Sequence, residues 1–425
     1  MDERFDRNRL EGVDRLMYDT IVVGAGPAGS MAAMTLADRG MQVLLLEKES
    51  MPRKKPCGGG LPIRTINRYP FIKDLHVIES YSYGGYVYSP SLQYTVEIVK
   101  EDPILAMVQR PTFDQTMVNY AINHGAAYRD KSVVTDVIIE SDYVRLKTNE
   151  GIDLKASMVI GADGFLSTIS RKTGLHEKNR THGVSLVEEF PLSHNEMNEY
   201  FKEEIFCHVF SKFKGIQGYG WVFPKKDHVN IGLVEYEDAQ SSAAKRYNLR
   251  TLFEQFLSIL RTRGIIPRDV VSTAAVGGIL PLQPLQRTYA NRILLCGDAA
   301  GFINPVSGEG IHYAISSGEI AGYIASQAVK HNDFTTSFLS RYQRKWMDEF
   351  GKEIKMMLRS KKQWRKEGER TIKLMCTDEK FAEMLFLTMT GKESMYDLRW
   401  KIVRRYLFVS FKHIFNREKN TLRSI

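Results

Sequence analysis

The chain has 425 residues, 43% of them hydrophobic, which fits a soluble globular protein of two or three domains and excludes disordered and fibrous classes. Its formal charge is +9, and no run of 18 or more apolar residues occurs, which excludes a membrane-spanning helix. The four cysteines form no C-x-x-C pair, so we expect a cytoplasmic protein with neither a metal site nor a disulfide framework.

The first elements predicted along the chain are a strand, a helix and a second strand. Residues 1–17 are charged and lack the apolar centre of a signal peptide, so we expect a flexible leader and no export by the usual route. Residues 18–23 form a short apolar run rich in β-branched side chains, residues 28–39 are rich in Ala, Met and Leu, and residues 42–46 are apolar again. These patterns are typical of strand, helix and strand.

The turn between the first strand and the helix reads Gly24-Ala-Gly26-Pro-Ala28-Gly29. Gly24 permits a tight bend, Gly26 lets the backbone approach a pyrophosphate, and Gly29 lets the helix pack closely on the strand. Phosphates would meet free N–H groups at the helix N-terminus. Glu47, at the end of the second strand, would accept hydrogen bonds from both ribose hydroxyls. The turn and the acid together predict a dinucleotide site.

Aromatic-rich, alternating stretches at residues 81–99 and 183–236 predict antiparallel strands that form a second sheet over the cofactor. Within them, Tyr219, Trp221 and Phe223 would lie on one face of a strand. Three rings on one face make a suitable wall for a long apolar substrate. They would equally suit a core between the sheet and the cofactor domain, so both interpretations stay open.

A later strand, residues 292–296, leads into Gly297-Asp298, and a helix of small residues runs from near Gly310 toward Lys330. In this context Asp298 can bind the ribityl chain of a flavin. The helix N-terminus at Gly310 and Ile311 can face the pyrimidine edge of the isoalloxazine, where its dipole stabilises the anionic reduced flavin. Together with the first turn, this motif makes FAD the expected dinucleotide.

After Phe338 the pattern is helical and strongly basic. Residues 351–373 and 391–425 each carry nine Lys or Arg against three acidic residues, so anionic surfaces or acidic redox proteins are expected partners, and nucleic acid is not. One helical stripe in the last segment consists of Trp400, Val403, Leu407, Phe411 and Ile414. This stripe would lie in the headgroup region of an anionic bilayer, on the inner face of the cell membrane, or would pack on its own domain.

With these motifs the chain resembles the flavoprotein superfamily of p-hydroxybenzoate hydroxylase, which includes aromatic monooxygenases, tryptophan halogenases and geranylgeranyl reductases. The stretch from Gly161 to Arg171 is similar to the superfamily's internal Asp-Gly motif, with Asp163 as its acid. Arg110 matches an Arg that contacts the flavin chain, and Val134 matches a strand residue beside the adenosine half. The resemblance covers residues 18 to about 330.

Two stretches resemble the geranylgeranyl reductases in particular. Residues 55–61 contain Cys57, Gly58 and Gly60 and are similar to a loop that lies against the flavin. The segment from Tyr219 to Pro224, followed by Ile231-Gly232, is similar to that family's substrate-sheet signature but departs from it at Ile231 and Val234. The halogenase branch expects Trp-x-Trp-x-Ile-Pro and a catalytic Lys, and it fits less well.

The resemblance implies an α/β fold: a Rossmann-like FAD-binding domain, a substrate domain with an antiparallel sheet and a C-terminal helical region. The division it implies is 18–75, 105–180 and 285–337 for the FAD-binding domain, 76–104 and 181–284 for the substrate domain, and 338–425 for the basic helical region. It also suggests a role for the Cys57 thiol near the flavin, as a contact or a redox group. For His312, next to the flavin-facing turn, two interpretations stay open: a proton source and a packing residue.

The function implied by the resemblance is the FAD-dependent reduction of C=C bonds in geranylgeranyl chains on an isoprenoid lipid. Electrons would come from NADPH or a reduced ferredoxin. Two alternatives remain open: an FAD-dependent monooxygenase of an aromatic or apolar substrate, and an electron-transfer flavoprotein that donates to quinone.

Overall fold

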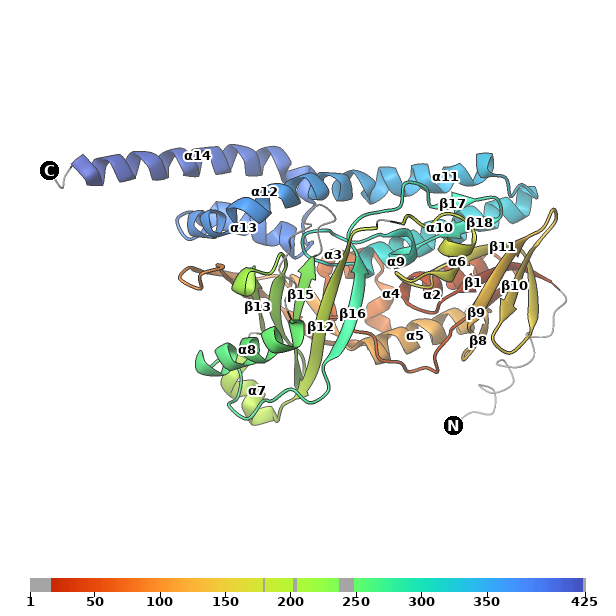
Figure 1. The fold of residues 1–425 in the computed structure, drawn as a ribbon, viewed down its shortest axis with the longest axis horizontal. Coiled ribbons are helices and arrows are strands. Elements are labelled where there is room, and N and C mark those ends of the chain that lie inside the picture. The colour runs from red at the N-terminus through yellow and green to blue at the C-terminus, as the bar shows by residue number, and fades with distance from the viewer. Residues whose placement is uncertain (1–16, 179, 202–204, 237–247, 423–425) are drawn as a thin grey trace.

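The structure is a computed structural model, and it describes residues 17–178, 180–201, 205–236 and 248–422, apart from the side chains of 362–366 and 413–422 (Figure 1). Most of the predicted leader lies outside the described residues. Three sheets organise the rest. The sheets and the helices on them form a mixed α/β fold, which confirms the predicted fold class.

The largest sheet has eight strands and a parallel centre. Its main path is β17 (Tyr289–Ala290), β18 (Ile293–Leu295), β11 (Asp153–Gly161), β1 (Tyr18–Val23), β2 (Val43–Leu46) and β8 (Ala127–Arg129). Two further strands, β9 (Val134–Ile139) and β10 (Val144–Thr148), extend antiparallel from the first half of β11. The carboxyl ends of β1, β2, β11 and β18 meet at one edge, where open parallel sheets bind their ligands.

Several helices share the apolar core of this sheet, among them α2 (Pro27–Ala37), α5 (Arg110–Asn123), α10 (Ile311–His331) and α11 (Thr336–Trp346). The strands at the centre are continuous apolar runs because they are covered in this core. Helices α2 and α10 lie unusually close, since a Cβ on Gly318 would stand 2.2 Å from the carbonyl oxygen of Ala28. The late helix predicted from residue 310 onward therefore closes the domain begun at residue 18.

The second sheet has seven strands, antiparallel except for one pair. In spatial order they are β16 (Val276–Pro281), β12 (His182–Pro191), β15 (His228–Tyr236), β14 (Tyr219–Pro224), β13 (Phe206–Ser211), β5 (Gly84–Tyr88) and β6 (Thr95–Val99). One face packs on α8 (Leu249–Thr262) and α7 (His194–Phe201) through an aromatic core that includes Phe210 and Phe256. The opposite face carries Trp221 and Phe223.

A third, three-stranded sheet consists of β3 (Gly60–Pro62), β7 (Leu105–Val108) and β4 (Ile78–Ser82). Its core also takes residues from α10, namely Ile311 and Ile315. The expectation that residues 81–99 all belong to the second sheet was therefore partly wrong. Only β5 and β6 pair with it, because Tyr81 and Ser82 pair with Ala106 and Leu105 of β7 instead.

Short helices and the C-terminal helices complete the described chain. The short ones are α3 (Ile63–Arg68), α4 (Phe71–Asp74), α6 (Thr168–Lys172), α9 (Gly297–Ala300) and the single turn η1 (Phe213–Gly215). After α11 follow a π-helical turn η2 (Met347–Gly351), α12 (Lys352–Met375), α13 (Glu379–Met389) and α14 (Met395–Leu422). Figure 1 shows α14 running beyond the rest of the molecule. The predicted domain boundaries stay a prediction.

Candidate FAD and substrate site

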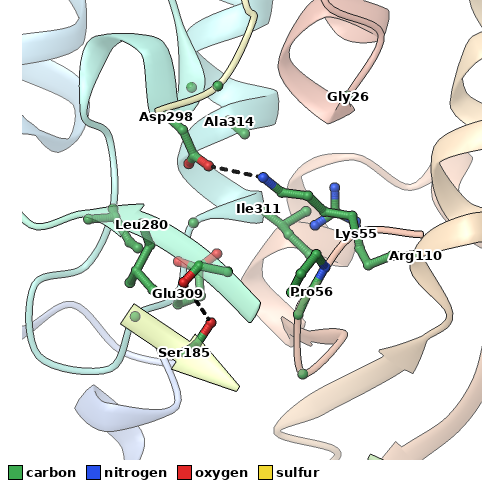
Figure 2. Close-up of a pocket in the computed structure, with 18 of the residues that line it drawn as sticks. Gly26, Lys55, Pro56, Arg110, Ser185, Leu280, Asp298, Glu309, Ile311 and Ala314 are labelled. Atoms are coloured by element: carbon green, nitrogen blue, oxygen red, sulfur yellow. Dashed lines mark hydrogen bonds and ion pairs between the residues drawn. The ribbon is translucent and has the colours of Figure 1, made fainter. Parts of the chain in front are cut away.

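A cavity of about 540 Å³ lies where the three sheets meet. Its wall brings together the glycine turn before α2, the loop around Cys57, the aromatic face of β14 and the N-terminus of α10. Figure 2 shows this convergence, with Gly26, Lys55, Asp298 and Ile311 around one space. All the cofactor and substrate residues predicted from the sequence, except Gly29, line this cavity. Gly29 lies in the first turn of α2.

The glycine turn has the geometry that its sequence predicts. Gly24 has φ +101°, and a Cβ there would lie 2.4 Å from the carbonyl oxygen of Ala162. A Cβ on Gly29 would lie 1.8 Å from the oxygen of Gly24, so the helix can begin this close to the strand only with glycine. Gly26 is the N-cap of α2 and no described side chain caps it, so its first N–H groups are open to a pyrophosphate.

Glu47 is buried directly after β2 and forms a hydrogen bond with the backbone of the glycine turn. Its Oε2 accepts a hydrogen bond of 2.9 Å from the backbone N–H of Ala25, and Arg53 lies 3.5 Å from the same oxygen. Val134 begins β9 on the same side of the cavity. The acid therefore supports the phosphate turn in addition to facing the place expected for a ribose. Its contact with the ribose stays a prediction.

Two charged residues in the cavity wall, the half-buried Asp163 and the buried Arg110, are held by contacts within the chain. Asp163 accepts hydrogen bonds from the N–H groups of Thr168 and Ile169, at 2.7 and 3.1 Å, and its burial raises its pKa. Arg110 forms a two-point pair with Asp114 at 2.8 and 2.8 Å. Burial opposes the charge on Arg110, but Asp114 outweighs it and raises the pKa. Contact of either side chain with the flavin stays a prediction.

Beside the glycine turn, Asp298 stands in the first turn of α9, and a Cβ on the preceding Gly297 would lie 2.9 Å from the Cβ of Ala28. Its carboxylate lies 3.9 Å from Lys55 Nζ, a pair that Figure 2 marks with a dashed line. Gly310 is the N-cap of α10, which begins at Ile311. This arrangement brings a carboxylate, an ammonium group and a helix N-terminus to one part of the cavity. It fits the ribityl chain and the pyrimidine edge of a flavin.

Glu309 was not foreseen from the sequence. Its Oε1 accepts a 2.7 Å hydrogen bond from the N–H of His312, one of the free donors that we had expected to face the flavin. Burial raises the pKa of Glu309 to about 7, against the opposing effect of Arg64. Its position between Gly308 and Gly310, in the turn that was predicted to face the flavin, was the signal available in the sequence.

His312 is a packing residue in this structure. Its Nδ1 lies 3.2 Å from the hydroxyl of Thr65, and burial, together with Arg64 and Arg68, lowers its pKa to about 3. The imidazole is therefore neutral near pH 7 and carries no readily released proton. Of the two interpretations of His312, the structure favours packing.

The Cys57 loop lies flat against the aromatic strand. A Cβ on Gly58 would lie 2.9 Å from the ring of Phe223, and Gly59 has φ +74°. Cys57 is half-buried, and its sulfur accepts a hydrogen bond of 3.4 Å from the N–H of Gly59. Glycines are needed here because the backbone and the rings approach so closely. The predicted role of the thiol at the flavin remains untested.

Tyr219, Trp221 and Phe223 lie on one face of β14, as the alternation predicts. Neighbouring ring centroids are 5.7 and 6.3 Å apart. Opposite Trp221, Gly232 leaves room for the indole, since a Cβ there would lie 2.1 Å from the ring. The hydroxyl of Tyr219 donates to the carbonyl of Ser307 in the flavin turn. The rings line the cavity and also belong to a packed cluster, so their role in substrate binding stays a prediction.

The cavity continues away from the flavin turn, between the second sheet and the C-terminal helices. Beside polar residues such as Lys212 and Thr390, six apolar residues line it there: Val87, Leu105, Cys207, Val209, Phe386 and Met389. We refer to these six residues as the apolar arm. The sequence predicted helices after residue 338 but not that α13 would form a wall of the cavity, since helical periodicity does not identify the partner of a face.

Within the described ranges, no group of three or more His, Cys, Asp or Glu residues could hold a metal ion, and all four cysteines are free. In the same part of the chain, no helix is long and apolar enough to cross a membrane.

Comparison with known proteins identifies the cofactor. A family described as an FAD binding domain matches residues 17–321. The residues in the cavity fit this cofactor, because a helix N-terminus without a side-chain cap, a glycine turn and a buried carboxylate lie where pyrophosphate and ribose need them. FAD is thus the cofactor of this chain, as predicted.

Two curated relatives are similar over most of their length. Digeranylgeranylglycerophospholipid reductase 2 of Methanopyrus kandleri is 32% identical over 81% of this chain and 86% of that protein. Digeranylgeranylglycerophospholipid reductase of Methanocaldococcus jannaschii is 30% identical over 78% of this chain and 83% of that protein.

A solved structure shows the same fold. A geranylgeranyl bacteriochlorophyll reductase-like protein from Thermoplasma acidophilum superposes with a TM-score of 0.75 and 23% identity, covering 90% of this chain and 98% of that one. The family match, the two relatives and the shared fold agree with the resemblance noted in the sequence. The chain belongs to the FAD-binding protein family that includes the digeranylgeranylglycerophospholipid reductases.

Proposed function

We propose that this chain is an FAD-dependent reductase that saturates C=C bonds of geranylgeranyl chains carried by a glycerophospholipid. The observation that carries the proposal is that one cavity extends from the glycine turn before α2, past the rings of β14, into the apolar arm. A long apolar chain fits such a passage, and the names of the relatives indicate the same substrate class.

An isolated alkene has no carbonyl that an enzyme could polarise, so positioning and exclusion of water must do most of the work. When bound, reduced FAD supplies a hydride to one alkene carbon, and a proton must reach the other. Trp221 and Phe223 would hold the alkene against the Cys57 loop. Glu47 and the turn at Gly26 would hold the dinucleotide, while Lys55 and Asp298 flank the flavin end.

The test is the mass of the product. Purified protein, reduced without oxygen, is incubated with a digeranylgeranylglycerophospholipid, and the lipid is analysed by mass spectrometry. We expect a gain of two hydrogen atoms per double bond reduced. The monooxygenase alternative instead predicts an oxygen-dependent gain of one oxygen atom. The quinone alternative predicts quinone reduction with the lipid unchanged. An unaltered lipid mass in the reduced incubation would overturn the proposal.

We propose NADPH or a reduced ferredoxin as the electron donor. The basic C-terminal helices support an acidic protein donor by charge, and their attraction for it would weaken with salt. Anaerobic flavin reduction is measured with each donor at low and high salt. Ferredoxin as donor predicts a salt-sensitive rate, whereas NADPH as donor predicts reduction without any protein partner.

We also propose that α14 contacts an anionic membrane surface. Helix α14 packs on the molecule through Ile402, Tyr406 and Val409. The predicted stripe faces outward, with Trp400, Leu407 and Phe411 exposed by 67%, 61% and 66%. The alternative that the stripe packs on its own domain is therefore wrong for these three residues, and Ile414 lies outside the described side chains.

Basic side chains accompany this outward face: Lys401, Arg404 and Lys412 are all exposed. Apolar side chains flanked by Lys and Arg suit the headgroup region of an anionic bilayer. We expect sedimentation with phosphatidylglycerol vesicles, little with phosphatidylcholine, and loss of binding in the triple variant Trp400→Ser, Leu407→Ser, Phe411→Ser. Val99→Ser, an exposed apolar side chain on β6, is the matched control. Equal binding by the triple variant and wild type would exclude this surface.

A further inference from the structure

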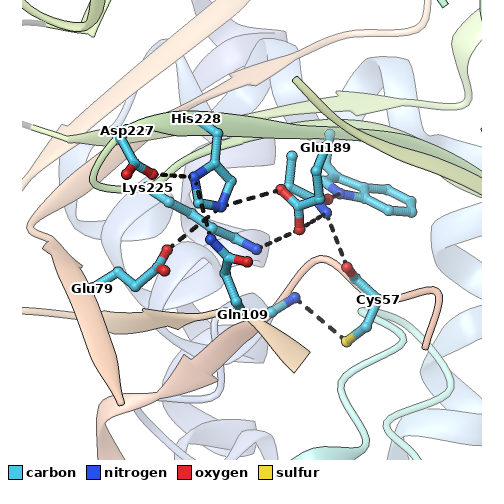
Figure 3. A network of polar contacts seen from close by, with 10 residues as sticks. Cys57, Glu79, Gln109, Glu189, Lys225, Asp227 and His228 are labelled. Carbon is cyan, nitrogen blue, oxygen red and sulfur yellow. Dashed lines mark hydrogen bonds and ion pairs between the residues drawn. The ribbon is translucent and has the colours of Figure 1, made fainter. Parts of the chain in front are cut away.

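A buried amide, Asn230 on β15, connects the aromatic strand to the Cys57 loop. Figure 3 shows the polar network to which it belongs, with Cys57, Glu189 and Lys225 labelled. Its Oδ1 accepts a 2.6 Å hydrogen bond from the indole N–H of Trp221. Its Nδ2 donates to the backbone carbonyl of Cys57 at 3.0 Å and to Glu189 Oε1 at 2.7 Å. One side chain thus touches both parts of the cavity wall that would enclose the alkene.

The orientation of this amide is fixed by its partners. The indole nitrogen of Trp221 can only donate, whereas the carbonyl of Cys57 and the carboxylate of Glu189 can only accept. Rotating the amide by half a turn would oppose donor to donor and acceptor to acceptor at all three contacts. Among natural side chains near this size, only an amide offers an acceptor and two donors in this arrangement.

Charged groups behind the amide keep it in place. Glu189 Oε1 also accepts a 2.6 Å hydrogen bond from Lys225, whose side chain is only 1% exposed. A Cβ on Gly59 would lie 3.1 Å from Lys225 Nζ, so this ammonium group lies directly beside the Cys57 loop. His228 lies 3.7 Å from the other oxygen of Glu189. Lys225 is buried whereas the Glu189 side chain is 41% exposed, so breaking this pair would leave a buried ammonium group without its acceptor.

We propose that Asn230 is a positioning residue that locks the Cys57 loop to the substrate wall. Its catalytic consequence rests on the proposed function. The loop lines the same cavity as the glycine turn, and Trp221 belongs to the wall that would hold the alkene. The amide therefore sets the separation between reductant and substrate. Misplacement of reacting groups by about 1 Å costs on the order of a hundredfold in rate.

Alkylation of Cys57 tests the lock without using the enzymatic reaction. The full chain with FAD bound is treated with iodoacetamide, and labelling of Cys57 is compared by peptide mass spectrometry with that of Cys376, the exposed cysteine. We expect Cys57 labelling in Asn230→Ala and Asn230→Asp to rise about fivefold relative to Cys376, the change in an opening equilibrium for one lost hydrogen bond. Asn230→Asp keeps an acceptor for Trp221 but cannot donate to Cys57 when ionised.

Two further variants separate a specific lock from general loosening. Trp221→Phe removes the indole donor but leaves the bond from Asn230 to Cys57, so labelling should match wild type. Glu188→Gln alters the neighbouring acid, which accepts hydrogen bonds from Ser272 and Thr273 outside this network. Labelling of Cys57 in this variant should also match wild type. Wild-type labelling in both Asn230 variants, or an equal rise in all four variants, would overturn the proposal.

Kinetics then test the consequence for catalysis. With the geranylgeranyl lipid, we expect kcat of Asn230→Ala to fall by about tenfold or more while KM changes by less than about twofold. Glu188→Gln should keep both constants. A loss confined to KM would contradict a positioning role. If wild type reduces no prenyl chain, the proposed function fails, yet the labelling result still decides whether Asn230 holds the loop.

Discussion

At the scale of single residues, Glu47 holds one part of the FAD site, the glycine turn, and is predicted to bind a second part, the ribose. Its carboxylate accepts the N–H of Ala25 in the glycine turn and lines the cavity where a ribose would lie. Hydrogen bonds to a charged group contribute about 1.5–3 kcal/mol each. We therefore expect the same side chain to couple the shape of the glycine turn to recognition of the sugar.

We expect Glu47→Gln to raise the dissociation constant of FAD by about tenfold or more, because the charge-assisted bonds are lost. Flavin fluorescence is measured while apoprotein is titrated with FAD. Glu140→Gln is the control, since Glu140 pairs with Arg145 beside β9 and β10 and does not line the cavity. Equal affinities for the two variants would contradict this role of Glu47.

Glu309 predicts a pH dependence of stability. Burial raises its pKa from an ordinary 4.5 to about 7, so the folded chain binds this proton more tightly than the unfolded chain. The resulting stabilisation is fully present below about pH 4.5 and is lost as the pH rises through about 7. In Glu309→Gln this loss should vanish, and Tm should fall less between about pH 5 and pH 8 than in wild type.

Thermal unfolding of both proteins across this pH range checks the expectation for Glu309. Glu140→Gln again serves as the control and should follow wild type at every pH. Parallel curves for Glu309→Gln and wild type would show that the carboxylate does not carry a raised pKa in the folded chain.

At the scale of elements, the contact between α2 and α10 fixes the position of the glycine turn relative to the N-terminal half of α10. Gly318 of α10 lies against the backbone of Ala28, in the first turn of α2. The two helices come from opposite ends of the predicted FAD-binding domain. Their contact therefore brings the flavin turn at Gly310 to the same cavity as the phosphate turn at Gly26.

Gly318→Ala would place a methyl group 2.2 Å from the oxygen of Ala28 and push the helices apart. We expect a loss of about 1–3 kcal/mol in unfolding free energy, together with weaker FAD binding. Urea denaturation measures the first effect. Gly277→Ala is the matched control, because the nearest atom to its Cβ would be 3.9 Å away. Similar urea midpoints for the two variants would refute the close helix contact.

At the scale of the whole molecule, the cavity is shared by all three sheets and by the C-terminal helices. FAD would bind only the folded arrangement, since residues at positions as distant as 24 and 310 must meet. Bound FAD at a free concentration of about 100 times its Kd contributes about 2.7 kcal/mol to the folded state.

Removal of FAD should therefore lower Tm by about 3 °C relative to that saturated state, for a chain of this length. Thermal unfolding is followed with and without added FAD. FMN, which lacks the adenosine half, should restore less of the loss because it leaves Glu47 without a ribose. A Tm that does not respond to FAD would show that the folded chain does not bind FAD in preference to the unfolded chain, which would contradict this cofactor site.

The sequence by itself determined the dinucleotide turn, Glu47, the flavin turn at Gly310 and the facing of Tyr219, Trp221 and Phe223. Each of these depends on residues close in sequence and on the fixed periods of strands and helices. Only the tertiary structure decided that Asn230 joins the loop at Cys57, 173 residues away. It alone showed that α13 lines the cavity and that the stripe on α14 faces outward. A periodic pattern defines the faces of an element, but long-range packing decides what each face meets.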